Sequence, residues 1–217
     1  MNKIYISNRV FEVKNKNLDL EVAGKCKITI INNKINNLNI LVKNASKLII
    51  EDFRIIDKEN TNIKISIEDN SYLNYIHSFI NNQEYNLNIV TRFFGNNSKI
   101  IFDIQGINDN GKATITADGV LGSKIYNELH ENIDIVNING GSGVVNPNIF
   151  VDKMPVIAEH AVTVGKINDN EVKYLTSKGM SLVEAKKLIL NGFLINKFKS
   201  EDLVVRIKEL IKTEVKR

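Results

Sequence analysis

Apolar and polar residues alternate through most of the first 165 positions of the chain. The clearest case is the segment 62–68, N-I-K-I-S-I-E, in which isoleucine occupies every second position. A period of two predicts a β-strand with one buried face and one solvated face. Further strands are expected at 3–13, 26–31, 38–42, 47–50, 72–76, 85–94, 99–104, 113–117 and 133–138, and no proline lies at the centre of an expected strand.

Asparagine pairs separate several of these strands, at 32–33, 36–37, 81–82 and 96–97. We interpret the pairs as turns, since asparagine favours turns and tolerates the left-handed backbone conformation that sharp corners require. Short strands that follow one another every 10–14 residues, roughly, suit two architectures. One is a sandwich or jelly roll, and the other is a β-helix of stacked coils with a continuous apolar interior. The alternation alone leaves both open.

The period changes from two to that of a helix in the last quarter of the chain. Asn168 is a candidate N-cap of a first helix that stops at Gly179. Ser181 and Glu184 have the spacing of a capping box and predict the start of a second helix, which we expect to end near Gly192. The sequence therefore divides into a β-rich domain, 1–165, and a C-terminal helical domain, 166–217.

A third helix is expected to begin at Ser200. Its apolar residues recur at helical spacing and form one stripe, made of Leu203, Ile207, Leu210 and Ile211. Such a stripe either docks against the β-rich part of the same chain or forms a surface for a partner protein. Periodicity favours the first interpretation without excluding the second.

Composition excludes several classes of protein. A formal net charge of +4, with both signs interspersed, is too small for a nucleic-acid-binding surface. No apolar stretch is long enough to cross a membrane, and residues 1–13 do not resemble a signal peptide. The single cysteine, Cys26, excludes an internal disulfide and a cysteine-only metal site. We expect a cytoplasmic protein that binds neither nucleic acid nor membrane.

Signatures of catalysis are largely missing, and the glycine-rich segment 140–143 is expected to be a turn, because no helix follows it. His77 lies in an aromatic strand, where a half-buried structural histidine is expected. His130 could bind a hard metal ion together with Glu128 and Glu131, although such a polar segment is more often simply solvated. A β-helix enzyme such as a polysaccharide lyase would need these acids and Glu68 to converge in a cleft.

His160 lies where the strands give way to the helices. Glu159 precedes it, but neighbouring residues of a strand point to opposite faces, so the two side chains cannot readily bind one ion together. The residues alone leave His160 as either a structural side chain or a ligand.

The segment 155–194 resembles the C-terminal signature of the SufB/SufD family of iron–sulfur cluster assembly proteins. The resemblance rests on A-E-H-A-V-T-V-G-K-I at 158–167, Y-L-T-S-K-G-M-S at 174–181, E-A at 184–185 and G-F-L at 192–194, in the order and spacing of the family. It implies a right-handed parallel β-helix followed by a small C-terminal helical domain. It also implies a shortened, SufD-like chain without the family's N-terminal helical region.

The resemblance further implies a non-enzymatic scaffold of the SUF system. Such a scaffold pairs with another SufB/SufD-type subunit, as a homo- or heterodimer, and docks a SufC-type ATPase through its C-terminal helices. The residues expected to form this dock are Tyr174, Leu175, Gly179, Met180, Leu182, Ala185, Leu188 and Phe193. The alternative is a β-helix that binds polysaccharide or another protein and has no part in cluster assembly.

Among the family's candidate ligands for iron or a cluster, only His160 has a counterpart in this sequence. No cysteine follows Cys26, and Ala161 stands directly after the histidine. Because thiolates are the usual ligands of iron–sulfur clusters, we expect no stably bound cofactor. Iron or a cluster would be held transiently and shared with a partner chain.

Overall fold

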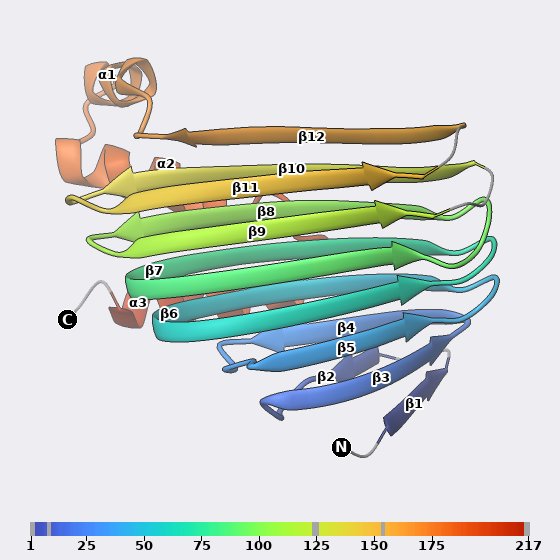
Figure 1. Cartoon of the computed structure of the whole chain (residues 1–217). Coiled ribbons are helices and arrows are strands. Elements are labelled where there is room, and N and C mark those ends of the chain that lie inside the picture. The colour runs from blue at the N-terminus through green and yellow to red at the C-terminus, as the bar shows by residue number, and fades with distance from the viewer. Residues whose placement is uncertain (1–2, 8–9, 123–125, 153–154, 215–217) are drawn as a thin grey trace.

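The computed structural model describes residues 3–7, 10–122, 126–152 and 155–214. Its strands pair in parallel and wind into a solenoid, which three helices follow (Figure 1). The predicted parallel β-helix with C-terminal helices is confirmed, and the sandwich is excluded. The strands are β1 (Lys3–Ser7), β2 (Val10–Glu12), β3 (Asn17–Ala23), β4 (Lys25–Ile31), β5 (Asn37–Val42), β6 (Lys47–Ile67), β7 (Tyr72–Phe93), β8 (Lys99–Asp109), β9 (Lys112–Leu121), β10 (Asn127–Ile138), β11 (Ser142–Val151) and β12 (Val156–Gly165).

The solenoid has two faces, each a stack of parallel strands. One stack, the front sheet, runs β1, β3, β5, the second half of β6, the second half of β7, β9 and β11. The other, the back sheet, runs β2, β4, the first half of β6, the first half of β7, β8, β10 and β12. Because β6 and β7 each pass from one sheet to the other, each of them joins two strands that the sequence predicts separately.

Isoleucine, leucine and valine from alternate positions of both sheets fill the interior, as the period of two predicts. Asparagine supplies many of the corners: positive φ angles occur at Asn32, Asn70, Asn97, Asn110 and Asn139. The expectation that asparagine serves the turns is confirmed at these positions.

Other asparagines form a ladder on the outer face of the front sheet. Asn17, Asn37, Asn62 and Asn88 occupy equivalent positions on successive strands. Each side-chain amide donates to the side-chain oxygen below it, over 2.8 Å from Asn37 to Asn17 and 3.2 Å from Asn88 to Asn62. The sequence analysis did not anticipate this ladder, because it depends on which residues stack between coils.

The sequence analysis also missed three strands, β3, β11 and β12. Pro147 lies in the middle of β11, so the expectation that no proline interrupts the centre of a strand is wrong. Within the described residues β11 pairs only with β9, so it is an edge strand. An edge strand tolerates proline, because half of its backbone N–H groups have no strand to donate to.

Helix α1 (Asp169–Ser177) begins as predicted: the Asn168 side chain accepts a hydrogen bond from the Asn170 amide. The predicted capping box of Ser181 and Glu184 starts α2 (Leu182–Ile195). The expectation that Gly192 marks the end region of this helix is confirmed, since Gly192 lies in the last turn of α2 and the helix ends at Ile195. The buried Leu194 packs against the solenoid and holds this last turn in place.

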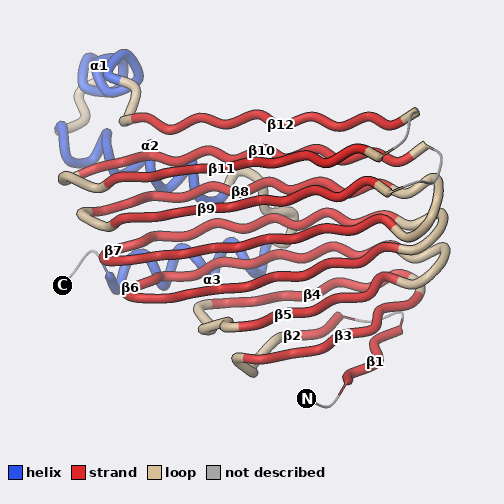
Figure 2. Tube along the Cα trace, in the orientation of Figure 1, coloured by secondary structure: helices blue, strands red, loops and turns tan. Residues whose placement is uncertain are grey.

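Helix α3 (Glu201–Glu214) packs along the outer face of the back sheet, behind the strands in Figure 2. Its residues Leu203, Ile207 and Ile211 form one hydrophobic cluster with residues of β6, β7 and β8, namely Phe53, Ile76 and Ile107. The buried Glu51 accepts hydrogen bonds from the backbone amides of Lys199 and Ser200, at 2.7 and 3.2 Å. The stripe of α3 therefore docks within the chain, and its alternative interpretation as a partner surface is wrong.

The division into domains 1–165 and 166–217 stays a prediction. β12 ends at Gly165 and α1 begins at Asp169, but α2 and α3 share their hydrophobic cluster with the back sheet.

Candidate functional site

His160 lies on β12, the outermost described strand of the back sheet, and its side chain is exposed. It pairs in register with Glu131 of β10, which in turn pairs with Phe102 of β8. Glu131 and Phe102 are buried inside the solenoid. Because stacked residues of a parallel ladder point to the same face, His160 continues this interior column. It is exposed because no described strand covers β12.

Glu131 is a buried carboxylate beneath this histidine, with 1% of its surface exposed. Neither of its carboxylate oxygens has a hydrogen-bond partner. Burial, and then the nearby Asp118, raise the pKa of Glu131 to about 7. Gly119 of the front sheet leaves room for the side chains of Leu129 and Glu131: a Cβ there would lie 2.2 Å from Leu129 Cδ2 and 3.6 Å from Glu131 Oε1.

The outer face of the same strands holds a different group of charges. His130 Nδ1 lies 3.2 Å from Glu159 Oε2, and its Nε2 lies 3.4 Å from Glu128 Oε2. Lys99 donates to Glu128 over 2.6 Å, and chiefly this hydrogen bond lowers the pKa of Glu128. Glu131 points into the solenoid instead, so the group predicted from His130, Glu128 and Glu131 is not assembled. Because side chains alternate between the two faces of β10, Glu128 and His130 point outward and Glu131 points inward.

Cys26 lies far from His160. It is buried on β4 and occupies the column that passes through Leu48, Leu73, Ile100 and Leu129 to Ala158 on β12. Five strand spacings separate the two ends of this column, which corresponds to about 24 Å. The thiol of Cys26 therefore does not contribute to the surroundings of His160.

A second polar group lies inside the middle coils. The guanidinium of Arg54 donates to both carboxylate oxygens of Asp52 at 3.0 Å, and to Glu59 over 2.6 Å. It also donates to Thr61 over 3.1 Å. Burial alone would raise the pKa of Asp52, but the charge of Arg54, together with hydrogen bonds from His77 and Tyr75, outweighs burial and holds it below its usual value.

His77 belongs to the same cluster. Its Nε2 lies 3.1 Å from the Tyr85 hydroxyl, and its Nδ1 lies 3.2 Å from Asp52 Oδ2. Burial lowers the pKa of His77 more than Asp52 raises it, so the ring is neutral near pH 7. The expectation of a half-buried histidine underestimated its burial, since the side chain is completely enclosed. Its enclosed contacts support the expected structural role.

The residues predicted to dock an ATPase separate into exposed and buried groups. Tyr174 of α1 and Leu182 of α2 are 62% and 54% exposed, and Leu188 is 52% exposed. Gly179 is exposed, while Leu175 and Met180 are half-buried. Ala185 is fully buried, and Phe193 packs into the cluster shared with the back sheet. The sequence analysis missed Val183, which is 74% exposed on α2. Its position outside the apolar stripe of the helix could have indicated this exposure.

Two comparisons with known proteins show which family part of this chain resembles. Residues 134–193 match the family described as SUF system FeS cluster assembly, SufBD core domain. The chain is also 32% identical over 77 residues to the iron–sulfur cluster assembly protein SufD of Bacillus subtilis (strain 168). Over residues 134–193 the chain is therefore similar to the SufB/SufD family. The predicted resemblance is confirmed. The alignment with SufD covers 34% of this chain and 18% of SufD, so the shared part is less than a fifth of that relative.

The SufBD core segment extends from the middle of β10 through β11, β12 and α1 into α2. It contains His160 and all eight residues predicted for the dock. Glu131 lies three residues before it, and the buried cluster around Arg54 lies far outside it. The sequence analysis considered Glu131 only beside His130, because its pairing with His160 requires the register of β10 and β12.

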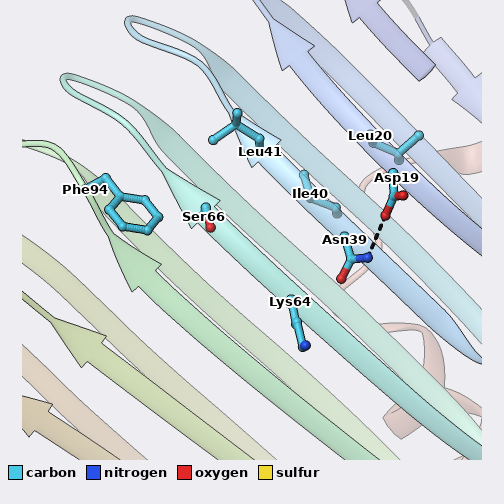
Figure 3. Close-up of a pocket in the computed structure, with 8 residues that line it drawn as sticks. All are labelled: Asp19, Leu20, Asn39, Ile40, Leu41, Lys64, Ser66 and Phe94. Carbon is cyan, nitrogen blue, oxygen red and sulfur yellow. Dashed lines mark hydrogen bonds between the residues drawn. The ribbon is translucent and has the colours of Figure 1, made fainter. Parts of the chain in front are cut away.

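A shallow hollow of about 480 Å³ lies on the outer face of the front sheet (Figure 3). Its lining consists of Asp19, Leu20, Asn39, Ile40, Leu41, Lys64, Ser66 and Phe94. The Asn39 amide donates to Asp19, and no histidine is among these lining residues.

The acids required for a β-helix enzyme do not converge. Glu68 pairs with Lys43 at 2.9 Å, Glu128 pairs with Lys99, and Glu131 faces the interior. In the described part of the chain, no helix is long and apolar enough to cross a membrane.

Proposed function

We propose that this chain is a non-catalytic, SufD-like scaffold subunit of a SUF-type iron–sulfur cluster assembly complex. The observation that carries this proposal is the SufBD core match over 134–193, on a parallel solenoid that ends in capped helices. The similarity to a protein named for iron–sulfur cluster assembly supports it. The scaffold acts by holding its partners in place, in the cytoplasm.

In this proposal a SufC-type ATPase docks on the exposed face of α1 and α2. Apolar side chains that stay exposed on a folded protein are typical of interaction surfaces. Tyr174, Leu182, Val183 and Leu188 have this character, whereas the apolar stripe of α3 is buried against the back sheet. Ala185 and Phe193 support the dock from within and do not contact the ATPase.

A second SufB/SufD-type subunit pairs with the open end of the solenoid. Within the described residues, β11 pairs only with β9 and β12 only with β10, so both strands present an unpaired edge. Val151, Ile157, Val162 and Val164 are exposed on these two strands. Unpaired edges with apolar side chains favour pairing with another chain.

Iron or a cluster is the cargo of this assembly, and His160 at the open end is its candidate ligand. The only thiol of the chain, Cys26, lies near the other end of the solenoid. The remaining ligands, thiolates above all, therefore come from the partner subunit.

Co-purification with a SufC-type ATPase tests the proposal. We expect the wild-type chain to retain the ATPase, and Leu182→Glu to lose it, because a charge in the apolar face opposes its burial. The matched control is Val205→Glu on α3, where the side chain is 56% exposed outside the proposed dock. Failure of the wild-type chain to associate, with or without ATP, would contradict the proposed function.

A further inference from the structure

We propose that Glu131 and His160 together bind a divalent cation at the open end of the solenoid. The inference deepens the proposed function and rests on it for the identity of the ion, which is ferrous iron in a cluster-assembly scaffold. Its new element is Glu131, which lies outside the SufBD core match and 29 residues before the histidine in the register of β10 and β12.

The register brings the two side chains together. Glu131 and His160 are direct partners of the parallel ladder, so their backbones lie about 4.8 Å apart. Both side chains point to the interior face, because Leu129 and Ile133 on either side of Glu131 are buried with it. A carboxylate and an imidazole at this separation can contact one ion, whose ligand distances are about 2.0–2.2 Å.

Glu131 lacks any other partner. Within the described ranges it is the one buried carboxylate of which neither oxygen accepts a hydrogen bond. A buried polar group without a partner costs free energy, and an unpaired charge costs more. A bound cation would supply the partner that the surrounding side chains do not, and His160, the register partner of Glu131, is exposed to solvent.

The chemistry of the two donors suits ferrous iron. Imidazole nitrogen binds iron, zinc and copper, and carboxylate oxygen binds harder ions. Two protein ligands leave the other coordination positions of the ion open. Because no described strand covers β12, these positions face solvent. This chain alone therefore binds the ion weakly and exchangeably, with water in the positions that a partner's groups would fill.

Glu159 provides the contrast. It stands next to His160 in the sequence but points to the outer face, where it contacts His130 at 3.2 Å. If closeness in sequence decided the ligand, Glu159 would be the better candidate. If the ligand is instead the residue that stacks with His160 on the interior face, Glu131 binds the ion and Glu159 does not.

Cobalt(II) added to the purified full-length chain tests this choice, with the ¹³C–¹H ring signals of the histidines as the readout. The chain has three histidines, so His→Gln variants assign every signal. We expect paramagnetic shift and broadening of the His160 ring. Glu131→Gln should weaken this effect about tenfold or more, since even groups that only support a metal ligand contribute that much to affinity.

Glu159→Gln is the matched control and should leave the apparent cobalt affinity at His160 unchanged within about twofold. The Glu131→Gln protein stays folded, because glutamine has the shape of glutamate and removes a buried charge, and circular dichroism checks this. The inference is overturned if His160 shows no cobalt effect, if Glu131→Gln leaves the effect intact, or if Glu159→Gln weakens it equally.

The outcome is separate from that of the ATPase experiment. Cobalt binding through Glu131 without ATPase association would keep this site and reject the SUF role. ATPase association without a Glu131-dependent cobalt effect would keep the SUF role and reject this site.

Discussion

Two groups of buried ionisable side chains in the solenoid differ sharply in the partners that surround them. In the middle coils, Arg54 donates to Asp52, Glu59 and Thr61. At the last coil, Glu131 is equally buried but has no hydrogen-bond partner. Both groups belong to the same stack of parallel strands, so the fold itself does not impose the difference.

The difference in partners distinguishes the cluster around Arg54, which is structural, from Glu131, which belongs to the candidate site. In the middle coils the opposite charges come from one strand, because Asp52, Arg54 and Glu59 all lie on β6. The last coil has a neighbour on one side only, and the side chain above Glu131 is the exposed His160. Buried polar groups without partners are uncommon in folded proteins, and one beside an open edge indicates that something outside the chain completes it.

Replacing Arg54 should have the largest effect on stability. Arg54→Met leaves Asp52 and Glu59 buried without their counter-charge, which we expect to lower the free energy of unfolding by about 3–5 kcal/mol. Urea denaturation monitored by circular dichroism measures this change. The control is Arg206→Met on α3, whose 3.4 Å contact with Glu12 is exposed, and which should cost no more than about 1 kcal/mol. Equal effects of the two variants would contradict a structural role for the cluster.

Replacing Glu131 should change how stability depends on pH. The folded state holds the Glu131 proton up to a pKa of about 7, above the ordinary value of 4.5. Between these values the folded state binds more protons than the unfolded state, so the free energy of unfolding falls as pH rises and levels off above about 7. The wild-type chain should lose about 3 kcal/mol across this window relative to Glu131→Gln.

Urea denaturation of both proteins at pH 4.5, 6 and 7.5 gives this difference. Titrating groups far from Glu131 are common to both proteins and cancel to first order. Unfolding free energies that remain parallel over the whole range would mean that Glu131 is hydrated or paired.

Removing the Tyr85 hydroxyl should have a smaller effect. Tyr85→Phe leaves His77 Nε2 without its contact at 3.1 Å, inside a closed interior. We expect a loss of about 1–3 kcal/mol in the free energy of unfolding, the cost of one unsatisfied buried group. A change below about 0.5 kcal/mol, measured by thermal or urea denaturation, would show that water or another group replaces the hydroxyl.

His160→Ala should have the smallest effect on stability, because its side chain is exposed and makes no contact that holds the fold. We expect a change within about 0.5 kcal/mol, as for ordinary surface substitutions. The same variant should lose the cobalt effect described above. A large loss of stability would identify His160 as a structural residue.

Much of the fold follows from local sequence. The period of two predicts strands such as 62–67, and the caps at Asn168 and Ser181 mark the starts of α1 and α2, because these signals act within a few residues. β11 escapes such reasoning, since Pro147 and three nearby glycines obscure a strand that only its edge position explains.

The candidate site was only half predictable. His160 is recognisable because its segment resembles the SufB/SufD signature. Which residue stacks beneath it, here Glu131, depends on the number of residues in one coil. That number follows from the lengths of the strands and corners between them, which a period of two does not specify. The same limit applies to the asparagine ladder and to the contact between His77 of β7 and Asp52 of β6, which joins two coils.

The state of the Glu131 carboxyl is the most direct test of the difference between the two interiors. A ¹³C NMR titration of the glutamate side-chain carboxyl carbons, assigned with Glu131→Gln, follows this group in the metal-free chain. A midpoint near pH 7 is predicted, because the carboxyl is buried and without a partner. A midpoint at or below 4.5, the ordinary value, would contradict the account, since it would mean that the open end of the solenoid already satisfies Glu131.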